Sequence, residues 1–211
     1  MTRAAVLVLC YLFGAVPFGL LIGKLTRGID IRQFGSGNIG ASNVLRTLGM
    51  GPALAVFFFD TAKGLAAVLL CHKLGLNQYW TVAGALLSVV GHTFSIFLNF
   101  QGGKGVATSL GVIIGLSPVI AAVAVGIWIV LVALTRYISV ASMVASASVP
   151  VQMILWKSMK VPAAYQVLAG LAALGIILKH KSNLVRLANR TEPRIGQKVD
   201  TNGKGGDEAD E

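Results

Sequence analysis

The chain alternates between long apolar runs and short polar stretches over residues 4–178. A helix needs about 20 apolar residues to cross about 30 Å of hydrocarbon, and most of these runs approach that length. Arg3 ahead of the first run also fits a signal peptide, but Pro17 and Gly19 lie inside the run and no clear cleavage site follows. The pattern therefore predicts retained membrane spans near residues 4–22, 52–70, 79–98, 139–155 and 161–178.

One further apolar run, residues 106–135, is too long for a single ordinary span. Pro118 disfavours helical geometry at Ser117, the residue before it, and so divides the run. We therefore expect a short span near residues 108–116 and a full span near 118–134, which gives seven spans in all. If Ser117 and Pro118 only kink one long helix, the chain has six spans instead.

The distribution of lysine and arginine favours seven spans. With seven, the loops 23–51, 99–105 and 136–138 share one face with the segment after residue 179, and that face carries thirteen of the 18 basic residues against four on the other. Cytoplasmic loops are enriched in lysine and arginine, so this face is predicted to be cytoplasmic. We expect an all-α polytopic membrane protein with seven transmembrane helices, one of them short, and the N-terminus outside.

The same pattern predicts the domain organisation. Residues 1–192 are expected to form a single membrane domain, and residues 193–211, which lack apolar periodicity, a disordered cytoplasmic tail. The composition agrees, because 55% of the residues are hydrophobic and only 12% are charged, about half the charged share of soluble domains. The net charge of +10 raises the question of nucleic acid, but the basic residues lie between or after apolar runs, so we expect no nucleic-acid partner.

Three polar stretches, residues 34–49, 100–108 and 179–186, interrupt the apolar pattern, and seven spans place all three on one face. Arg46 in the first stretch offers a planar fork for phosphate. In the second, Gly102, Gly103, Lys104 and Gly105 precede an apolar helix, whose free N–H groups and positive dipole end attract anions. The spacing does not fit the nucleotide-binding motif GxxxxGK[ST], so nucleotide hydrolysis is not expected. These features predict a phosphate-binding site at the membrane face.

Other ionisable residues are assigned structural roles. Asp60 and Lys63 stand three residues apart inside a span, where charges face the protein interior, and are expected to pair. His92 is expected to be a hydrogen-bond donor at a helix end. The three histidines lie in different segments without neighbouring carboxylates, so no metal site is expected, and no cofactor.

At these motifs the sequence closely resembles the PlsY-type acyl-phosphate:glycerol-3-phosphate acyltransferases of bacterial inner membranes. The resemblance covers about residues 5–192. It rests on residues 36–46 (SGNIGASNVLR), on Gly91 and His92 together with residues 102–108 (GGKGVAT), and on a third group formed by His180, Asn183, Arg186 and Glu192. Asp60, Lys63 and Gly64 also look like the family. Ser42 stands where threonine is usual in the family, and Arg190 where a glycine is common.

The resemblance implies that the sn-1 hydroxyl of glycerol 3-phosphate attacks the acyl carbon of an acyl phosphate, which gives lysophosphatidate and inorganic phosphate for phospholipid synthesis. It also implies a set of catalytic residues that bind glycerol 3-phosphate and its reacting hydroxyl, namely Ser36, Arg46, Lys104, His180 and Asn183. It implies substrate binding, including the acyl phosphate and the developing oxyanion, by Asn38, Gly40, Ser42, Asn43, Gly102, Gly103, Gly105, Ser142 and Glu192. The base is left open between His180 and an oxygen of the acyl phosphate itself.

The resemblance also implies a place in the cell and a set of partners. The protein is expected in the bacterial inner membrane with its active site at the cytoplasmic face, in contact with membrane lipid and with the soluble enzyme that makes acyl phosphate. The alternative function is a transporter for a phosphorylated metabolite, because cationic helix ends also mark transport sites. Against a transporter, all the polar stretches lie on one face and no inverted repeat is visible.

Overall fold

The computed structural model describes residues 2–197, and every regular element within that range is helical. The longer elements are α1 (Arg3–Ala15), α2 (Phe18–Arg27), α3 (Ala41–Leu48), α4 (Met50–Lys73), α5 (Gln78–Thr93), α6 (Val106–Leu116), α7 (Pro118–Thr135), α8 (Ile138–Leu155), α9 (Ala163–Lys179) and α10 (Lys181–Ala188). Short 3₁₀ turns follow α2, α5 and α8 at Ile31–Gln33, Ile96–Leu98 and Lys157–Met159.

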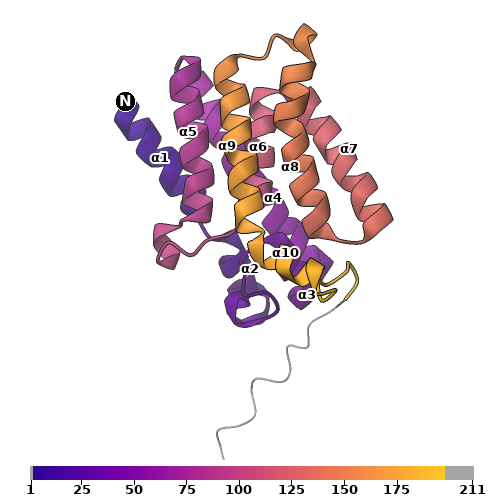
Figure 1. The fold of residues 1–211 in the computed structure, drawn as a ribbon. Coiled ribbons are helices and arrows are strands. Elements are labelled where there is room, and N and C mark those ends of the chain that lie inside the picture. Colours follow the sequence, from indigo (N-terminus) through magenta and orange to yellow (C-terminus); the bar gives the residue numbers. More distant parts are fainter. Residues whose placement is uncertain (1, 198–211) are drawn as a thin grey trace, which may run out of the picture.

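The long helices stand side by side, and the short helices α2, α3 and α10 gather at one end of the bundle (Figure 1). Within residues 2–197, five helical segments are long and apolar enough to cross a membrane, or six if the bent pair α9–α10 is one span. The all-α membrane fold predicted from the sequence is therefore confirmed. The count of seven stays a prediction, because α6 has only 11 residues. The side of the N-terminus also stays a prediction; the start of α1 lies at the end of the bundle opposite α10 (Figure 1).

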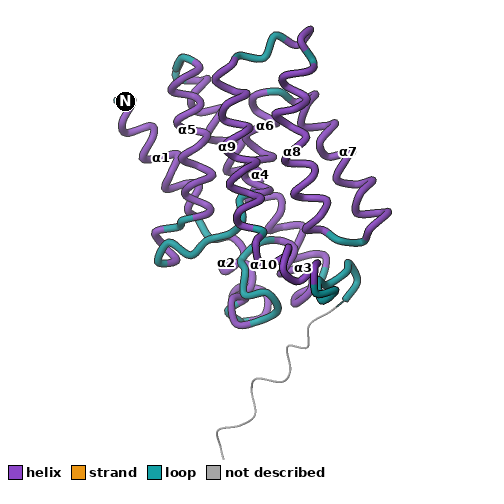
Figure 2. The backbone as a smooth tube through the Cα atoms, viewed as in Figure 1, coloured by secondary structure: helices purple, strands orange, loops and turns teal. Residues whose placement is uncertain are grey.

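The helix breaks lie where the local sequence places them. Ser117 separates α6 from α7 and Pro118 begins α7, as the sequence predicted. The first apolar run is not one continuous helix, since α1 ends at Ala15 and α2 begins at Phe18 on the far side of Pro17. Proline lacks the N–H that would continue the hydrogen-bond ladder, which explains the break. The loops that follow α2 and α5 lie at the same end of the bundle as α3 and α10 (Figure 2).

Close contact between α4 and α6 fixes the position of the second polar stretch. A Cβ atom added at Gly64 of α4 would lie 2.0 Å from the carbonyl oxygen of Thr108, and one added at Gly111 of α6 would lie 1.9 Å from that of Thr61. Small residues at both positions let the two backbones touch, as is common in membrane proteins. The N-terminus of α6, with the glycine loop before it, is thereby held beside α4.

Part of the segment predicted as a disordered tail is ordered. Ile195 and Arg136, in the turn between α7 and α8, exchange two hydrogen bonds: the Ile195 N–H donates to the Arg136 carbonyl at 2.8 Å, and the Arg136 guanidinium donates to the Ile195 carbonyl at 3.0 Å. The Arg194 Nε donates to the hydroxyl of Tyr137 at 3.2 Å. Residues 193–197 therefore lie against the helical body, and residues 198–211 lie outside the described residues.

Candidate active site

A cavity of about 450 Å³ brings the three polar stretches together, and we call it the polar cavity because residues of all three line it among apolar side chains. Eleven of the fourteen residues predicted from the sequence line it, namely Ser36, Asn38, Gly40, Ser42, Asn43, Arg46, Lys104, Gly105, Ser142, His180 and Asn183. Glu192 lines a neighbouring cavity of about 260 Å³, which shares Ser42 and Arg46 with the first. Gly102 and Gly103 line neither cavity. Most of the residues predicted from the sequence therefore line one cavity, but their individual contacts were not predicted.

The first polar stretch is organised by the amide of Asn43, which is only 1% exposed. Its Oδ1 accepts from the backbone N–H of Ser36 at 2.9 Å. Its Nδ2 lies 2.9–3.1 Å from three carbonyl oxygens, those of Ile31, Phe34 and Asn38. Both polar atoms of Asn43 are therefore occupied within the loop, and the loop presents Ser36 and Asn38 to the cavity.

Arg46 of α3 reaches the cavity from the same stretch. Its Nε donates to the carbonyl of Ser42 at 3.2 Å, which orients the guanidinium along the helix. Burial lowers the pKa of Arg46, and the charge of Glu192 acts in the opposite direction. A guanidinium keeps its proton under all physiological conditions, so Arg46 brings a permanent positive charge with two donor edges.

The structure corrects the expected role of Gly102 and Gly103. The N–H of Gly102 donates to the carbonyl of Thr93 at 3.1 Å, and that of Gly103 donates to the carbonyl of His92 at 3.0 Å. These two amides donate to the end of α5 and are therefore not free to bind an anion. Instead, Gly105 caps the N-terminus of α6 with φ +84°, a conformation that favours glycine, and the first turn of α6 opens onto the cavity through Val106 and Ala107.

Lys104 projects from this glycine loop to the third polar stretch, where its Nζ donates to Oδ1 of Asn183. Burial lowers the pKa of Lys104 to about 8, and the positive charges of Arg186 and Arg46 act in the same direction. The lysine is therefore mostly charged at neutral pH but close to losing its proton. An incoming anion would restore the charge by pairing with it.

His180 lies at a bend, because α9 and α10 meet there at 52°. Its Nδ1 lies 2.8 Å from the carbonyl oxygen of Ile176. A carbonyl only accepts, so Nδ1 carries the proton and Nε2 is left as an acceptor. Burial lowers the pKa of His180 to about 4, and the charge of Lys104 adds to the effect. The imidazole is neutral at physiological pH.

Glu192 orients Asn183 through a hydrogen bond from outside the polar cavity. The Nδ2 of Asn183 donates to Oε1 of Glu192 at 2.7 Å, and the Nε of Arg186 donates to Oε2 at 2.8 Å. Burial raises the pKa of Glu192, but the neighbouring Ser139 hydroxyl, the hydrogen bonds from Asn183 and Arg186 and the charge of Arg186 outweigh it, so the net pKa lies below the ordinary value. The carboxylate turns the amide oxygen of Asn183 towards Lys104. Glu192 therefore contacts the site through Asn183 rather than by lining the larger cavity.

Two lining residues, Asp60 and His92, were assigned structural roles from the sequence but also face the polar cavity. An ionisable side chain inside a span is a functional candidate by default, and that signal was available for Asp60. The same signal was available for His92, which lies inside the predicted span 79–98, but its contact with the glycine loop depends on how the end of α5 packs and could not be predicted. Sequence reasoning therefore placed both side chains correctly in the interior and missed their contact with the site.

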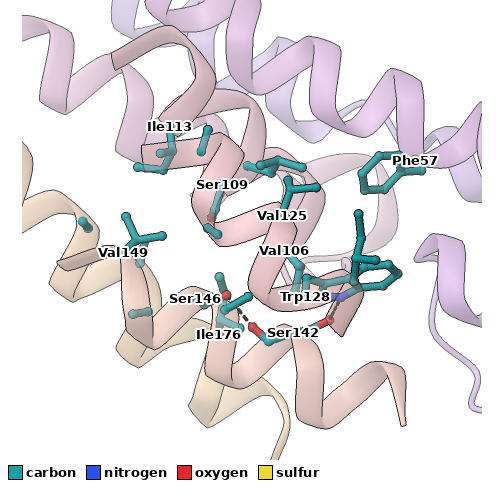
Figure 3. A pocket seen from close by; sticks show the side chains of 18 residues that line it. Phe57, Val106, Ser109, Ile113, Val125, Trp128, Ser142, Ser146, Val149 and Ile176 are labelled. Carbon is teal, nitrogen blue, oxygen red and sulfur yellow. Dashed lines mark hydrogen bonds between the residues drawn. The ribbon is translucent and has the colours of Figure 1, made fainter. Parts of the chain in front are cut away.

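An apolar cavity of about 250 Å³ adjoins the polar one and shares Phe57, Val106, Trp128 and Ser142 with it. Its far side is lined by aliphatic side chains that include Ile113 and Val149 (Figure 3). Trp128 Nε1 donates to the hydroxyl of Ser142 at 3.2 Å at the junction between the two (Figure 3). A ligand that fills both cavities must carry an anionic end and an apolar end.

This combination of a cation-lined cavity and an apolar cavity inside a helical bundle defines a membrane protein that handles an anionic amphiphile. The family model described as "Glycerol-3-phosphate acyltransferase" matches residues 4–190, and the chain belongs to this family. The chain is 46% identical over 188 residues to the glycerol-3-phosphate acyltransferase of Synechococcus sp. (strain JA-2-3B'a(2-13)), covering 89% of this chain and 92% of the relative. It is 45% identical to a glycerol-3-phosphate acyltransferase of Thermus thermophilus, covering 92% and 96%.

Solved structures agree with this assignment. The crystal structure of PlsY, an integral membrane glycerol 3-phosphate acyltransferase, in its glycerol 3-phosphate form, is similar with a TM-score of 0.86 and 35% identity, covering 92% of this chain and 96% of that one. The lysophosphatidic acid form matches with a TM-score of 0.83. The relatives and structures named here are acyltransferases, so the transporter hypothesis finds no support in them.

Proposed function

We propose that this protein transfers an acyl group from an acyl phosphate to the sn-1 hydroxyl of glycerol 3-phosphate, giving lysophosphatidate and inorganic phosphate. The hydroxyl oxygen forms the new ester bond to the acyl carbon, the bond from that carbon to the phosphate oxygen breaks, and the hydroxyl proton leaves with the phosphate. The observation that carries the proposal is the junction of the cation-lined cavity with the apolar cavity at Val106, Trp128 and Ser142.

The phosphate groups of both substrates require cations and N–H donors, and two separate sets reach the cavity. Arg46 and Lys104 carry positive charge into it from different polar stretches. The first turn of α6 adds unpaired N–H groups and the positive end of the helix dipole. We assign glycerol 3-phosphate to Arg46, Lys104 and Ser36, and the acyl phosphate to the start of α6 beside the apolar cavity, where Ser142 stands.

His180 is assigned to the reacting hydroxyl. Its Nε2 is free to accept a hydrogen bond from that hydroxyl, because Nδ1 donates to Ile176. With a pKa of about 4, the imidazole is a weak base at neutral pH. We therefore assign His180 the orientation of the hydroxyl and assign the proton to an oxygen of the acyl phosphate, which becomes the leaving phosphate.

Two substitutions at His180 separate orientation from base catalysis. His180→Ala is expected to lower kcat by about 10²–10⁴-fold under either assignment. His180→Gln retains an amide oxygen that accepts from the hydroxyl but takes up no proton at neutral pH, so it is expected to recover most of the rate. A glutamine variant as slow as the alanine variant, with wild-type affinity for glycerol 3-phosphate, would assign the proton to His180.

The apolar cavity is assigned to the acyl chain. Its lining includes Ile113, Val149 and Ile176, and none of the side chains that line it carries a charge. Phe57 of α4 and Trp128 of α7 stand where it meets the polar cavity, so an acyl phosphate extended across the junction would place its carbonyl carbon near Ser142.

We place the protein in the bacterial inner membrane with the polar cavity at the cytoplasmic face. Support comes from the thirteen lysines and arginines that the seven-span topology puts on that face. The soluble enzyme that makes acyl phosphate is then a partner on the same side. Delivery of the donor from that side also matches the position of all three polar stretches at one end of the bundle (Figure 2).

The activity is tested with purified protein, radiolabelled glycerol 3-phosphate and one acyl donor at a time. Lysophosphatidate is expected with acyl phosphate and not with acyl-CoA or acyl-carrier protein. Product formed from acyl-CoA alone would reject the proposed donor while retaining the acceptor. Counterflow of the label in proteoliposomes serves as the test for transport, and none is expected.

A further inference from the structure

A network of three buried ionisable side chains lies next to the polar cavity. Asp60 and Lys63 of α4 are 2% and 1% exposed, and the side chain of His92 at the end of α5 is 4% exposed. The Nζ of Lys63 lies 2.8 Å from Oδ1 of Asp60 and donates to the carbonyl of Val16 at 3.0 Å. Ionisable groups at such depth are costly, and a purely structural bundle would do better with apolar side chains.

Lys63 is not the only neighbour of the Asp60 carboxylate. The same oxygen, Oδ1, also faces Nδ1 of His92 at 3.6 Å. Both atoms are buried, and apart from the ion pair with Lys63 neither has a hydrogen-bond partner among the described residues. The shortest adjustment that satisfies both is a hydrogen bond from Nδ1 to the carboxylate. Such a bond would fix the imidazole in one orientation and one tautomer, as carboxylates do for other buried histidines.

The opposite edge of the His92 ring touches the glycine loop. A Cβ atom added at Gly103 would lie 2.2 Å from Nε2 of His92, so only glycine fits against the ring. The backbone carbonyl of His92 also accepts from the N–H of Gly103 at 3.0 Å. The same residue thus contacts Gly103 through its side chain and through its main chain, and the next residue in the loop is Lys104.

We propose that Asp60 and His92 are positioning residues of the active site: Asp60 orients the imidazole, the imidazole supports Gly103, and the loop thereby holds Lys104 at the substrate phosphate. Lys63 holds Asp60 in place because it pairs with the carboxylate and also donates to the carbonyl of Val16, at the break between α1 and α2. The inference rests on the proposed function, because it concerns how glycerol 3-phosphate is bound. It differs from a structural role in predicting weaker substrate binding by protein that is still folded.

His92→Asn tests the loop contact, because the asparagine amide occupies the place of Nδ1 and lacks the far edge of the ring. We expect the KM for glycerol 3-phosphate to rise about 10- to 100-fold, since misplacement by about 1 Å costs that much, with a smaller change in kcat. His72, an exposed histidine at the end of α4, provides the matched control, and His72→Asn is expected to leave both constants unchanged. An unchanged KM in a His92→Asn protein with a lowered melting temperature would overturn the inference.

The proposed orientation of His92 by Asp60 must be tested with a variant that still folds. Asp60→Asn alone would leave Lys63 buried without a counter-charge, so the double variant Asp60→Asn/Lys63→Met removes both charges together. We expect a rise in KM similar to that of His92→Asn, while the protein elutes from size exclusion at the wild-type volume. Wild-type affinity in the double variant would show that Asp60 does not act on the loop.

A double-mutant cycle tests the contact itself. Gly103→Ala places a methyl group against Nε2 of His92, and His92→Ala opens the space that this methyl group needs. If the two residues act through one contact, the double variant His92→Ala/Gly103→Ala is no less active than Gly103→Ala alone. Losses that multiply would overturn the inference.

Calorimetric titration of glycerol 3-phosphate without any acyl donor separates this inference from the proposed function. If the wild-type protein binds and acylates glycerol 3-phosphate and the variants bind it equally well, the inference is rejected and the proposed function stands. Wild-type protein that neither binds nor acylates glycerol 3-phosphate rejects the proposed function and the inference together.

Discussion

The two glycine-rich stretches of the candidate active site line the same cavity but are held by different forces. Residues 34–41 owe their shape to one buried side chain, Asn43, whose amide bonds four backbone groups. Residues 102–105 owe theirs to backbone hydrogen bonds and to the close approach of His92, with no comparable side chain of their own. The first loop therefore depends on the hydrogen bonds of the Asn43 amide. The second depends on glycine at positions 102 and 103, where a side chain would clash with His92.

The largest effect is expected at the second loop. A Cβ atom at Gly102 would lie 2.0 Å from the backbone oxygen of His92, so Gly102→Ala must displace the main chain. We expect kcat/KM to fall by about 10³-fold, measured with acyl phosphate and glycerol 3-phosphate. The control is Gly126→Ala in α7, where nothing lies within 4 Å of the added atom, and wild-type activity is expected there. Equal activity of the two variants would contradict the close-approach account.

At the first loop, a change of one atom tests the role of the amide. Asn43→Asp keeps the acceptor for Ser36 but replaces the donor with an oxygen that repels the three nearby carbonyls. We expect kcat/KM to fall by about 10²-fold and the melting temperature to drop. Asn77→Asp is the matched control, because Asn77 caps α5 by accepting only, a task that aspartate performs equally well. A fully active Asn43→Asp would mean that the loop holds its shape without the amide.

The cations of the two loops differ in the geometry that they offer to an anion. Arg46→Lys keeps the positive charge of the first loop and loses the planar fork. We expect the KM for glycerol 3-phosphate to rise by about 30-fold, with little change in kcat, because a bidentate contact is replaced by a single one. Steady-state kinetics at saturating acyl phosphate measures this change. A KM equal to that of the wild type would remove Arg46 from the substrate site and leave it as a topology signal.

The cations also differ in how they titrate. The pKa of Lys104 is lowered from 10.5 to about 8, chiefly by burial, whereas Arg46 stays charged. Lys104 therefore loses its charge as the pH rises through about 8, and kcat/KM for glycerol 3-phosphate is expected to fall by about tenfold between pH 7 and pH 9. Lys104→Arg should shift this decline to higher pH. A decline that stays at pH 8 in that variant belongs to another group.

Local sequence predicted much of the fold and site, and long-range packing decided the rest. The division at Ser117 follows from the proline after it, and the three polar stretches were predicted to share a face from their spacing between apolar runs. The partners of the Gly102 and Gly103 amides were not predictable, because they depend on the end of α5 lying beside the glycine loop. The 52° bend at His180 was likewise missed, since no proline or glycine marks it. Periodicity identifies the elements but not which of them become neighbours.

The order in which residues of the site occur along the chain has a consequence for its biosynthesis. Ser36 and Arg46 leave the ribosome early, Lys104 near the midpoint, and His180 and Asn183 only after α9 has been made. The segment that contacts Arg136 through Ile195 follows later still. A nascent chain in the membrane therefore has the cations of the site before it has the imidazole that we assign to the reacting hydroxyl. If His180 and Asn183 act as proposed, a chain arrested before α9 is inserted is expected to release no lysophosphatidate into the bilayer.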